Sequence, residues 1–277
     1  MVHFYWDTKN MSQNQYKIAE YIQKNIHDVL FSTEQEIADQ LDISIASVSR
    51  FWRAVGYKNL KEFKAKAKEQ LEVTPARKLK NVLTKVDRTH PQNHFMENSV
   101  HHILETMNQF SSTTFTEAVE TLTSAERIYL YGPGPSVGLA ELMQYRIHRF
   151  GLSIHRFQRS GSELLEDLLH IRKDDVVVLF CFIRLLPEAN VILAEAKRIG
   201  FRTIVITDRL LSTFHKEADV VLFTSRGELW EFHSMVAPTF MVENLIIAIG
   251  MNNQHESIGH LEQLDTLRRQ YRHQLPR

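Results

Sequence analysis

The fold of this 277-residue chain is decided by the stretch from Arg127 to Gly151, RIYLYGPGPSVGLAELMQYRIHRFG. A short apolar run over residues 128–131 breaks into the loop GPGPS, residues 132–136, and apolar residues then recur at helical spacing up to Gly151. A strand, a glycine loop and a helix in this order open a ligand site in α/β domains. The reason is that a helix N-terminus presents unpaired N–H groups and a partial positive charge.

Downstream of this stretch, strand-like and helix-like segments alternate to about residue 250. We expect strands at 128–131, 153–157, 175–182, 203–207 and 220–223, and helices at 136–149, 162–170, 187–199 and 232–250. The segment DVVVLFCF, residues 175–182, is apolar enough for a central strand of a parallel sheet. Repeated βα units with right-handed crossovers predict an α/β three-layer sandwich with a parallel five-stranded sheet.

Upstream, residues 12–30 predict one helix, and residues 31–63, FSTEQEIADQLDISIASVSRFWRAVGYKNLKEF, predict two more with a short turn between them. Ser32 or Thr33 is a candidate cap of the first of these two helices, and Ser44 caps the second, which Gly56 closes. Asp42 falls in the turn, where a left-handed backbone is needed. This spacing predicts an N-terminal all-α helix-turn-helix domain.

Charge is balanced over the whole chain, with 33 basic and 33 acidic residues, but it is concentrated locally. Residues 44–68 hold seven Lys and Arg against one acid, Glu62. Such an excess is a candidate phosphate-facing surface, although a solvated helix face has the same composition. The N-terminal part of the second helix would enter the major groove of DNA. The candidate DNA-binding residues are Ser44, Ser47, Ser49, Arg50, Arg53 and Lys58.

The segment IADQLDISIASVSRFWRAVGYKNLKEFK, residues 37–64, resembles the N-terminal domain of the RpiR-type bacterial transcriptional regulators. That family shows an Ile-Ala helix, then VS-x-x-[ST]-V-x-R-F and LG-[FY]-x-x-[FL]-x-E-[FL]-K. The residues that match it here are Ile43-Ser44, Ser47-Val48, Arg50-Phe51, Val55-Gly56-Tyr57 and Leu60 to Lys64. The resemblance implies a transcriptional regulator of sugar or amino-sugar metabolism that binds double-stranded operator DNA as a homodimer or higher oligomer.

The second half resembles a sugar isomerase (SIS) domain, through the patterns A-x-R-I-x-x-x-G-x-G-x-S and I-x-I-T-D…A-D-x-x-L. The matching residues are Ala125, Arg127-Ile128, Gly132, Gly134, Ser136, Ile204, Ile206-Thr207-Asp208, Ala218-Asp219 and Leu222. The resemblance implies a phosphosugar-like effector, and the two resemblances together cover about residues 12–250. The positions that the SIS resemblance implies for effector binding are Gly132, Gly134, Ser136 and Thr207. Arg184 is a further candidate, because a guanidinium can bind an anion through two parallel hydrogen bonds.

The SIS pattern is altered at its phosphate-binding loop, S-x-S-G-x-T, which falls on residues 181–186, CFIRLL. Its hydroxyl side chains are replaced by side chains that, apart from Arg184, are apolar or nearly so and do not hydrogen-bond a phosphate. Pro133 and Pro135 remove two N–H donors from the first loop. We therefore expect a degenerate effector site on a retained fold.

Two other functions fit parts of the sequence. A sugar-phosphate isomerase needs a base beside the sugar, for which Glu163, Glu166, His155, His233 and Glu243 qualify by chemistry alone. A nucleotide-binding protein is suggested by Gly132-x-Gly134-x-x-x-Gly138, one residue longer than G-x-G-x-x-G. The attached helix-turn-helix and the altered loop favour a regulator without enzyme activity.

Composition supports a cytoplasmic protein with no metal and no cofactor. The single cysteine, Cys181, excludes a disulfide framework, and the fourteen histidines follow no zinc-site spacing. We expect a helix-turn-helix domain over residues 1–72, a linker over 73–95 with a short helix near 76–86, and a SIS-like domain over 96–277 for effector binding and dimerisation. Residues 260–277 predict an amphipathic helix that docks on its own domain or on a second subunit.

Overall fold

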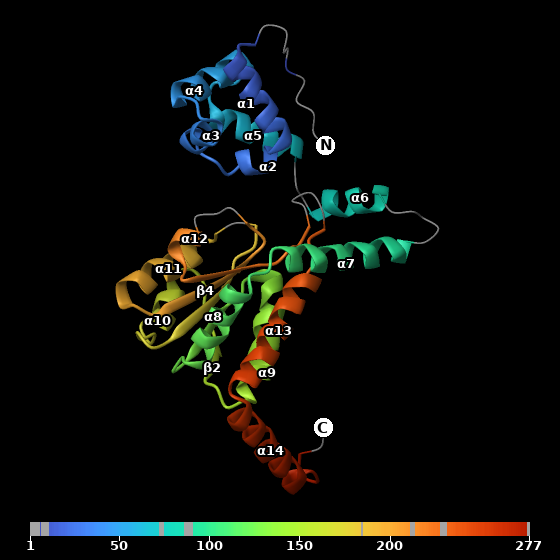
Figure 1. The fold of residues 1–277 in the computed structure, drawn as a ribbon, viewed down its shortest axis with the longest axis vertical. Helices are drawn as coiled ribbons and strands as arrows, with labels where there is room; N and C mark the ends of the chain where they lie inside the picture. The colour runs from blue at the N-terminus through green and yellow to red at the C-terminus, as the bar shows by residue number, and fades with distance from the viewer. Residues whose placement is uncertain are drawn as a thin grey trace. The chain divides into compact units, whose positions relative to one another are not determined.

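The computed structural model describes Trp6 and residues 11–71, 75–85, 91–183, 185–210, 214–227 and 232–275. The chain divides into two compact units, one within residues 1–86 and one within residues 87–227 and 233–277 (Figure 1). The domain limits at 72 and 95 stay a prediction.

The first unit is helical. Its helices are α1 (Gln13–Lys24), α2 (Ile26–Val29), α3 (Glu34–Leu41), α4 (Ile45–Ala54), α5 (Leu60–Leu71) and α6 (Pro75–Lys85). The single helix expected over residues 12–30 is interrupted at Asn25, whose side-chain amide donates to the Tyr21 carbonyl at 3.0 Å and closes α1. The cap of α3 is the second of the two candidates, Thr33, which forms a capping box with Glu36.

An aromatic core holds these helices together. Phe51, Trp52 and Phe63 are fully buried, and the rings of Trp52 and Phe63 stack with centroids 4.8 Å apart. Trp6 meets Phe51 edge to face at 5.4 Å, so a residue outside the helices also closes the core. Aromatic pairs of this kind contribute about 0.5–1.5 kcal/mol each beyond the burial of their area. Because Phe51 and Trp52 lie on α4, that helix is fixed by its buried face.

The second unit is an α/β sandwich, as the sequence predicts. Its strands are β1 (Ile128–Tyr131), β2 (Ile154–Arg156), β3 (Val176–Phe180), β4 (Arg202–Thr207) and β5 (Val220–Phe223). They form one parallel sheet in the order β2-β1-β3-β4-β5, so the predicted central strand is central. Its helices are α7 (Pro91–Asn108), α8 (Ser112–Thr123), α9 (Val137–His148), α10 (Leu164–Leu168), α11 (Pro187–Ile199), α12 (Phe214–Glu217), α13 (Val236–Asn252) and α14 (Gln254–Tyr271).

Alternation along β3 divides the core between the two faces of the sheet. Val176, Val178 and Phe180 pack in the cluster that includes residues of α8, α9 and α13, whereas Val177 and Leu179 pack with residues of α10 and α11. A strand whose successive side chains are both buried must lie between two helical layers, which explains its uniform apolarity. The three layers predicted from the βα alternation are therefore present (Figure 1).

The C-terminal helices differ from their expected limits. The helix expected over residues 232–250 begins at Val236, and the tail helix expected at 260–277 begins at Gln254. Most of α14 is exposed, and it extends away from the sheet in Figure 1, with Ser257 as its one buried residue in the described part.

Candidate functional site

The turn between α3 and α4 has the backbone that a helix-turn-helix requires. Asp42 takes the left-handed conformation, with φ 52° and ψ 53°, as predicted from its place in the sequence. The Ile43 N–H donates to the Ala38 carbonyl at 3.0 Å across this turn. Ala38 is only 1% exposed, so a larger side chain there would separate the two helices.

The predicted recognition helix, α4, has one buried face and one exposed face. Val48, Phe51 and Trp52 are buried, while Arg50 and Arg53 are exposed on the other side. The exposed side also carries Ile45 and Ala46. This leaves two guanidinium groups on the surface that the sequence assigns to DNA.

The serines of α4 are more constrained than the arginines. The Ser44 hydroxyl accepts from the Ser47 N–H at 3.3 Å, and the two hydroxyls are 2.9 Å apart, so Ser44 caps the helix as predicted. The Ser49 hydroxyl donates to the carboxylate of Glu34 in the first turn of α3. A contact of these serines with DNA stays a prediction, and for Ser44 and Ser49 it competes with a bond inside the domain.

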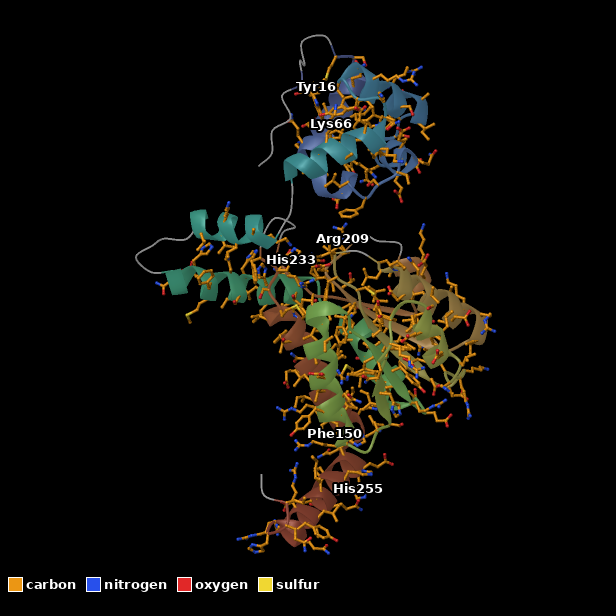
Figure 2. The ribbon with its side chains drawn as sticks, turned by 180° about the vertical axis from the view of Figure 1, so that it is seen from behind. Tyr16, Lys66, Phe150, Arg209, His233 and His255 are labelled. Carbon is orange, nitrogen blue, oxygen red and sulfur yellow. The ribbon has the colours of Figure 1, made fainter. Side chains whose placement is uncertain are left out.

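Glu62, the single acid of the basic stretch, is used inside the domain. Its carboxylate accepts from the Lys58 N–H at 2.6 Å and pairs with Lys66 Nζ at 3.2 Å. These bonds, the Lys58 N–H first, lower the pKa of Glu62. Lys66, on α5 (Figure 2), also lies over the Tyr57 ring at 5.4 Å.

The remaining basic side chains that the structure describes in this stretch fall into two classes. Lys64 Nζ donates to the Ser32 carbonyl at 2.6 Å, so its charge is fixed within the domain. Arg50, Arg53, Lys58 and Lys61 have exposed side chains, and no side-chain bond of theirs is found in the described residues. The structure therefore distinguishes basic side chains that are bonded within the domain from those that are available to bind phosphates.

In the second unit, the glycine loop after β1 is shaped by packing. A Cβ on Gly132 would lie 2.7 Å from the Ser136 carbonyl oxygen and 3.2 Å from the Ala140 Cβ, so a side chain at 132 does not fit. Gly134 has φ 58°, in the left-handed region that glycine adopts without cost. Both glycines are explained by the fold, whether or not a ligand binds there.

The loop offers few donors to an anion. Pro133 and Pro135 have no N–H; the Ser136 N–H donates to the Pro133 carbonyl at 3.2 Å, and the Val137 N–H donates to the Gly134 carbonyl. Ser136 is buried, and its hydroxyl has no partner among the described residues. Of the predicted effector contacts in this loop, only that hydroxyl remains available as a side-chain donor.

Two backbone donors of the loop after β3 are also occupied within the protein. The Cys181 N–H donates to the Ile206 carbonyl at 2.9 Å, and the Ile183 N–H donates to Asp208 Oδ1 at 2.8 Å. Ile183 has φ 67°, which is rare for a β-branched residue and costs on the order of 1–3 kcal/mol. Arg184, predicted as an anion contact, lies outside the described residues.

Thr207 ends β4, the next strand in the sheet. It is fully buried, and its hydroxyl accepts from the Arg209 N–H at 3.2 Å, which shapes the turn that follows. Because the strands are parallel, the loops after β1, β3 and β4 lie at the same edge of the sheet, where the strands have their carboxyl ends. The order of the strands along the chain reverses between β1 and β3. Ligands of open α/β sheets bind at this kind of switch point.

Sequence reasoning missed a charged cluster at the same edge. Arg226, which follows β5, lies with Nη1 3.6 Å from Asp208 Oδ2 and with its guanidinium 4.4 Å from the centre of the Phe182 ring. Burial lowers the pKa of Arg226 and raises that of Asp208. Figure 2 shows Arg209, the neighbour of Asp208, and His233 at this end of the unit. The signal in the sequence is an arginine three residues after the end of a predicted strand.

The loop of Arg226 is anchored to α7. The Ser225 N–H donates to Thr106 Oγ1 at 2.9 Å, and the Ser225 hydroxyl lies 3.2 Å from His102 Nδ1 and bonds the carboxylate of Glu105. These are contacts between residues more than a hundred positions apart in the chain.

The residues proposed for an isomerase are partly engaged elsewhere. Glu166 pairs with Arg159, and His155 Nε2 lies 3.0 Å from the Ser153 hydroxyl at the outer strand β2. No cluster of three or more potential metal ligands occurs in the described residues. None of the described helices has both the length and the apolarity to cross a membrane.

Two family models match the chain, the helix-turn-helix domain of the rpiR family over residues 6–73 and the SIS domain over residues 121–250. The chain belongs to the RpiR family. An HTH-type transcriptional regulator of Caldanaerobacter subterraneus is 25% identical over 260 residues, 92% of each chain. This organisation, shared with relatives of that description, indicates a transcriptional regulator.

Solved structures share the fold. The NanR protein of Vibrio vulnificus, complexed with ManNAc-6P, aligns with a TM-score of 0.65 at 19% identity over 94% of each chain. The sugar isomerase domain of an RpiR transcription factor from Sphaerobacter thermophilus aligns with a TM-score of 0.60 at 22% identity, over 64% of this chain and 99% of that one.

Proposed function

We propose that this RpiR-family regulator binds double-stranded operator DNA through α4, and that a small anionic effector at the SIS sheet edge changes its affinity for DNA. The observation that carries the proposal is the exposed face of α4, where Arg50 and Arg53 stand opposite a fully buried aromatic face. A helix held by its buried face presents its other face rigidly, which favours contacts with bases and phosphates. The protein works in the cytoplasm, where its DNA is.

The oligomeric state follows from the same reasoning. Helix-turn-helix proteins read paired half-sites, so we propose a homodimer paired through the SIS unit. Effector binding then biases two arrangements of the dimer and changes the separation of the DNA-binding domains. The regulated genes belong to sugar or amino-sugar metabolism, a proposal supported by the phosphorylated amino sugar bound in the similarly folded NanR protein.

We propose that the chain is not an enzyme. The isomerase alternative needs a free base beside a group of phosphate-binding donors. Glu166 is paired with Arg159, and four backbone N–H groups of the two loops donate to other residues of the protein. Sequencing DNA that co-purifies with the full-length protein, followed by binding to the recovered sequence, tests the regulator directly. Recovery of random fragments without enrichment would refute operator binding. Turnover of hexose or pentose phosphates by the purified protein would refute the absence of catalysis.

A further inference from the structure

Arg226 is a buried charged group whose hydrogen-bond donors are poorly satisfied among the described residues. It is 7% exposed, its Nε is buried without a hydrogen-bond partner, and no other side-chain hydrogen bond is found for it among the described residues. Its nearest carboxylate oxygen, Asp208 Oδ2, is 3.6 Å from Nη1, beyond hydrogen-bond length. A buried guanidinium with open donors is costly, and such a group needs an explanation.

Asp208 does not provide that explanation, because its carboxylate has another task. Oδ1 accepts from the Ile183 N–H at 2.8 Å and so fixes the left-handed backbone of Ile183. Burial outweighs the attraction between the two charges, since the pKa of Asp208 is raised and that of Arg226 is lowered. The two side chains are close enough for Asp208 to orient the guanidinium, but too far apart to form a hydrogen bond.

Arg226 lies beside the segment that lacks the hydroxyl residues of the SIS phosphate loop. Its guanidinium packs on the ring of Phe182, which belongs to the segment 181–186 where the hydroxyl residues of the phosphate loop are missing. Phe182 follows β3 and Arg226 follows β5, so the side chain reaches across the end of β4. A second unpartnered polar atom, Thr224 Oγ1, is buried two residues away.

We propose that Arg226 binds the oxyanion, phosphate or carboxylate, of the small-molecule effector and replaces the lost hydroxyl donors of the β3 loop. The planar Nε–Nη edge of a guanidinium bonds two oxygens of either group at once. Phe182 supports the plane of the guanidinium, and Asp208 limits its rotation. The inference rests on the proposed effector function of the SIS unit and specifies the chemistry of its ligand.

The test uses the full-length protein and three probes: inorganic phosphate, fructose 6-phosphate and gluconate. Calorimetric titration of wild type separates a phosphate ligand from a carboxylate ligand. Arg226→Met, which keeps the volume and removes the charge, should weaken binding of the preferred probe by about tenfold to a hundredfold. Arg226→Lys keeps the charge and loses the fork, so its affinity should lie between the two. Arg198→Met is the matched control, because Arg198 is exposed on α11 and pairs with Glu195 of the same helix.

Three outcomes overturn the inference: no probe binds wild type, Arg226→Met binds as tightly as wild type, or Arg198→Met loses as much affinity. If Arg226→Met does not fold, the double variant that carries Arg226→Met and Asp208→Asn takes its place in the comparison, because it removes both buried charges. DNA binding, measured on the same samples, separates this inference from the proposed function. Wild type that binds DNA and no probe refutes the role of Arg226 alone, whereas wild type that fails to bind DNA refutes the regulator.

Discussion

The sorting of the basic side chains predicts how DNA binding depends on salt. Arg50, Arg53, Lys58 and Lys61 are exposed without a described partner, whereas the charge of Lys66 is paired with Glu62. Each phosphate neutralised contributes about −0.9 to the slope of log K against log salt concentration. If all four available cations contact phosphates, the slope is about −3.6 for each DNA-binding domain and about twice that for a dimer.

Replacing one of these arginines should change the slope by a calculable amount. Arg50→Ala and Arg53→Ala should each make it less steep by about 0.9 per domain, or about 1.8 for a dimer. Lys66→Ala should change it much less, because that ammonium already faces a carboxylate 3.2 Å away and the Tyr57 ring. All three substitutions lie within the same basic stretch, so net charge changes equally and only position differs.

Fluorescence anisotropy of a labelled duplex measures the slope, over roughly 50–200 mM salt. A duplex of arbitrary sequence is sufficient, because the phosphate contribution does not depend on base sequence. Thermal melting of each variant confirms that the domain is folded. An equal decrease in slope for Lys66→Ala and Arg50→Ala would show that net charge, and no defined face of α4, governs binding. An unchanged slope for both arginine variants would refute the assignment of α4 as the recognition helix.

Three further predictions concern the SIS unit. Asp175→Asn should lower the free energy of unfolding by about 2–4 kcal/mol in urea denaturation, because the buried carboxylate bonds Arg127 Nε and Nη2 at 3.0 and 2.8 Å; a change below about 0.5 kcal/mol would contradict this. Burial raises the pKa of Cys181 to about 12, so at pH 8 Ellman's reagent should react with the native thiol on the order of a thousandfold more slowly than with the unfolded chain, and equal rates would show an open site. Gly132→Ala should destabilise by roughly 1–3 kcal/mol, since its Cβ would lie 2.7 Å from the Ser136 carbonyl oxygen, and an unchanged melting temperature would mean that the loop moves freely.

The helix-turn-helix was predictable because its signals are local. A left-handed turn at Asp42, a cap at Ser44 and a small residue at position 38 each act within a few residues of one another. The break at Asn25 was missed because the apolar spacing continues through it. The interruption is marked by a hydrogen bond from the Asn25 side-chain amide to the Tyr21 carbonyl. The helix over Leu60–Leu71 was also missed, because this segment is rich in lysine, although Phe63 and Ala67 on it are buried.

The order of the strands was harder to predict than their number. Apolar runs identify the strands, and the uniform apolarity of β3 places it inside the sheet. Nothing in a run of four or five residues states that β1 lies between β2 and β3. That arrangement depends on contacts between distant segments, and the edge where Asp208 and Arg226 meet depends on it in turn.

The glycine loop shows why a motif alone does not establish a ligand. Gly132 is required because the first turn of α9 passes too close for a side chain, and Gly134 is required because its φ is 58°. Both requirements hold in the empty fold, so the same glycines would persist after loss of a phosphate site. Side-chain donors on neighbouring loops are under no such constraint, and a hydroxyl lost after β3 can be replaced by a guanidinium after β5 without disturbing the sheet. The chemistry of the effector is therefore indicated by the side chains around Arg226, whereas the glycines indicate only the fold.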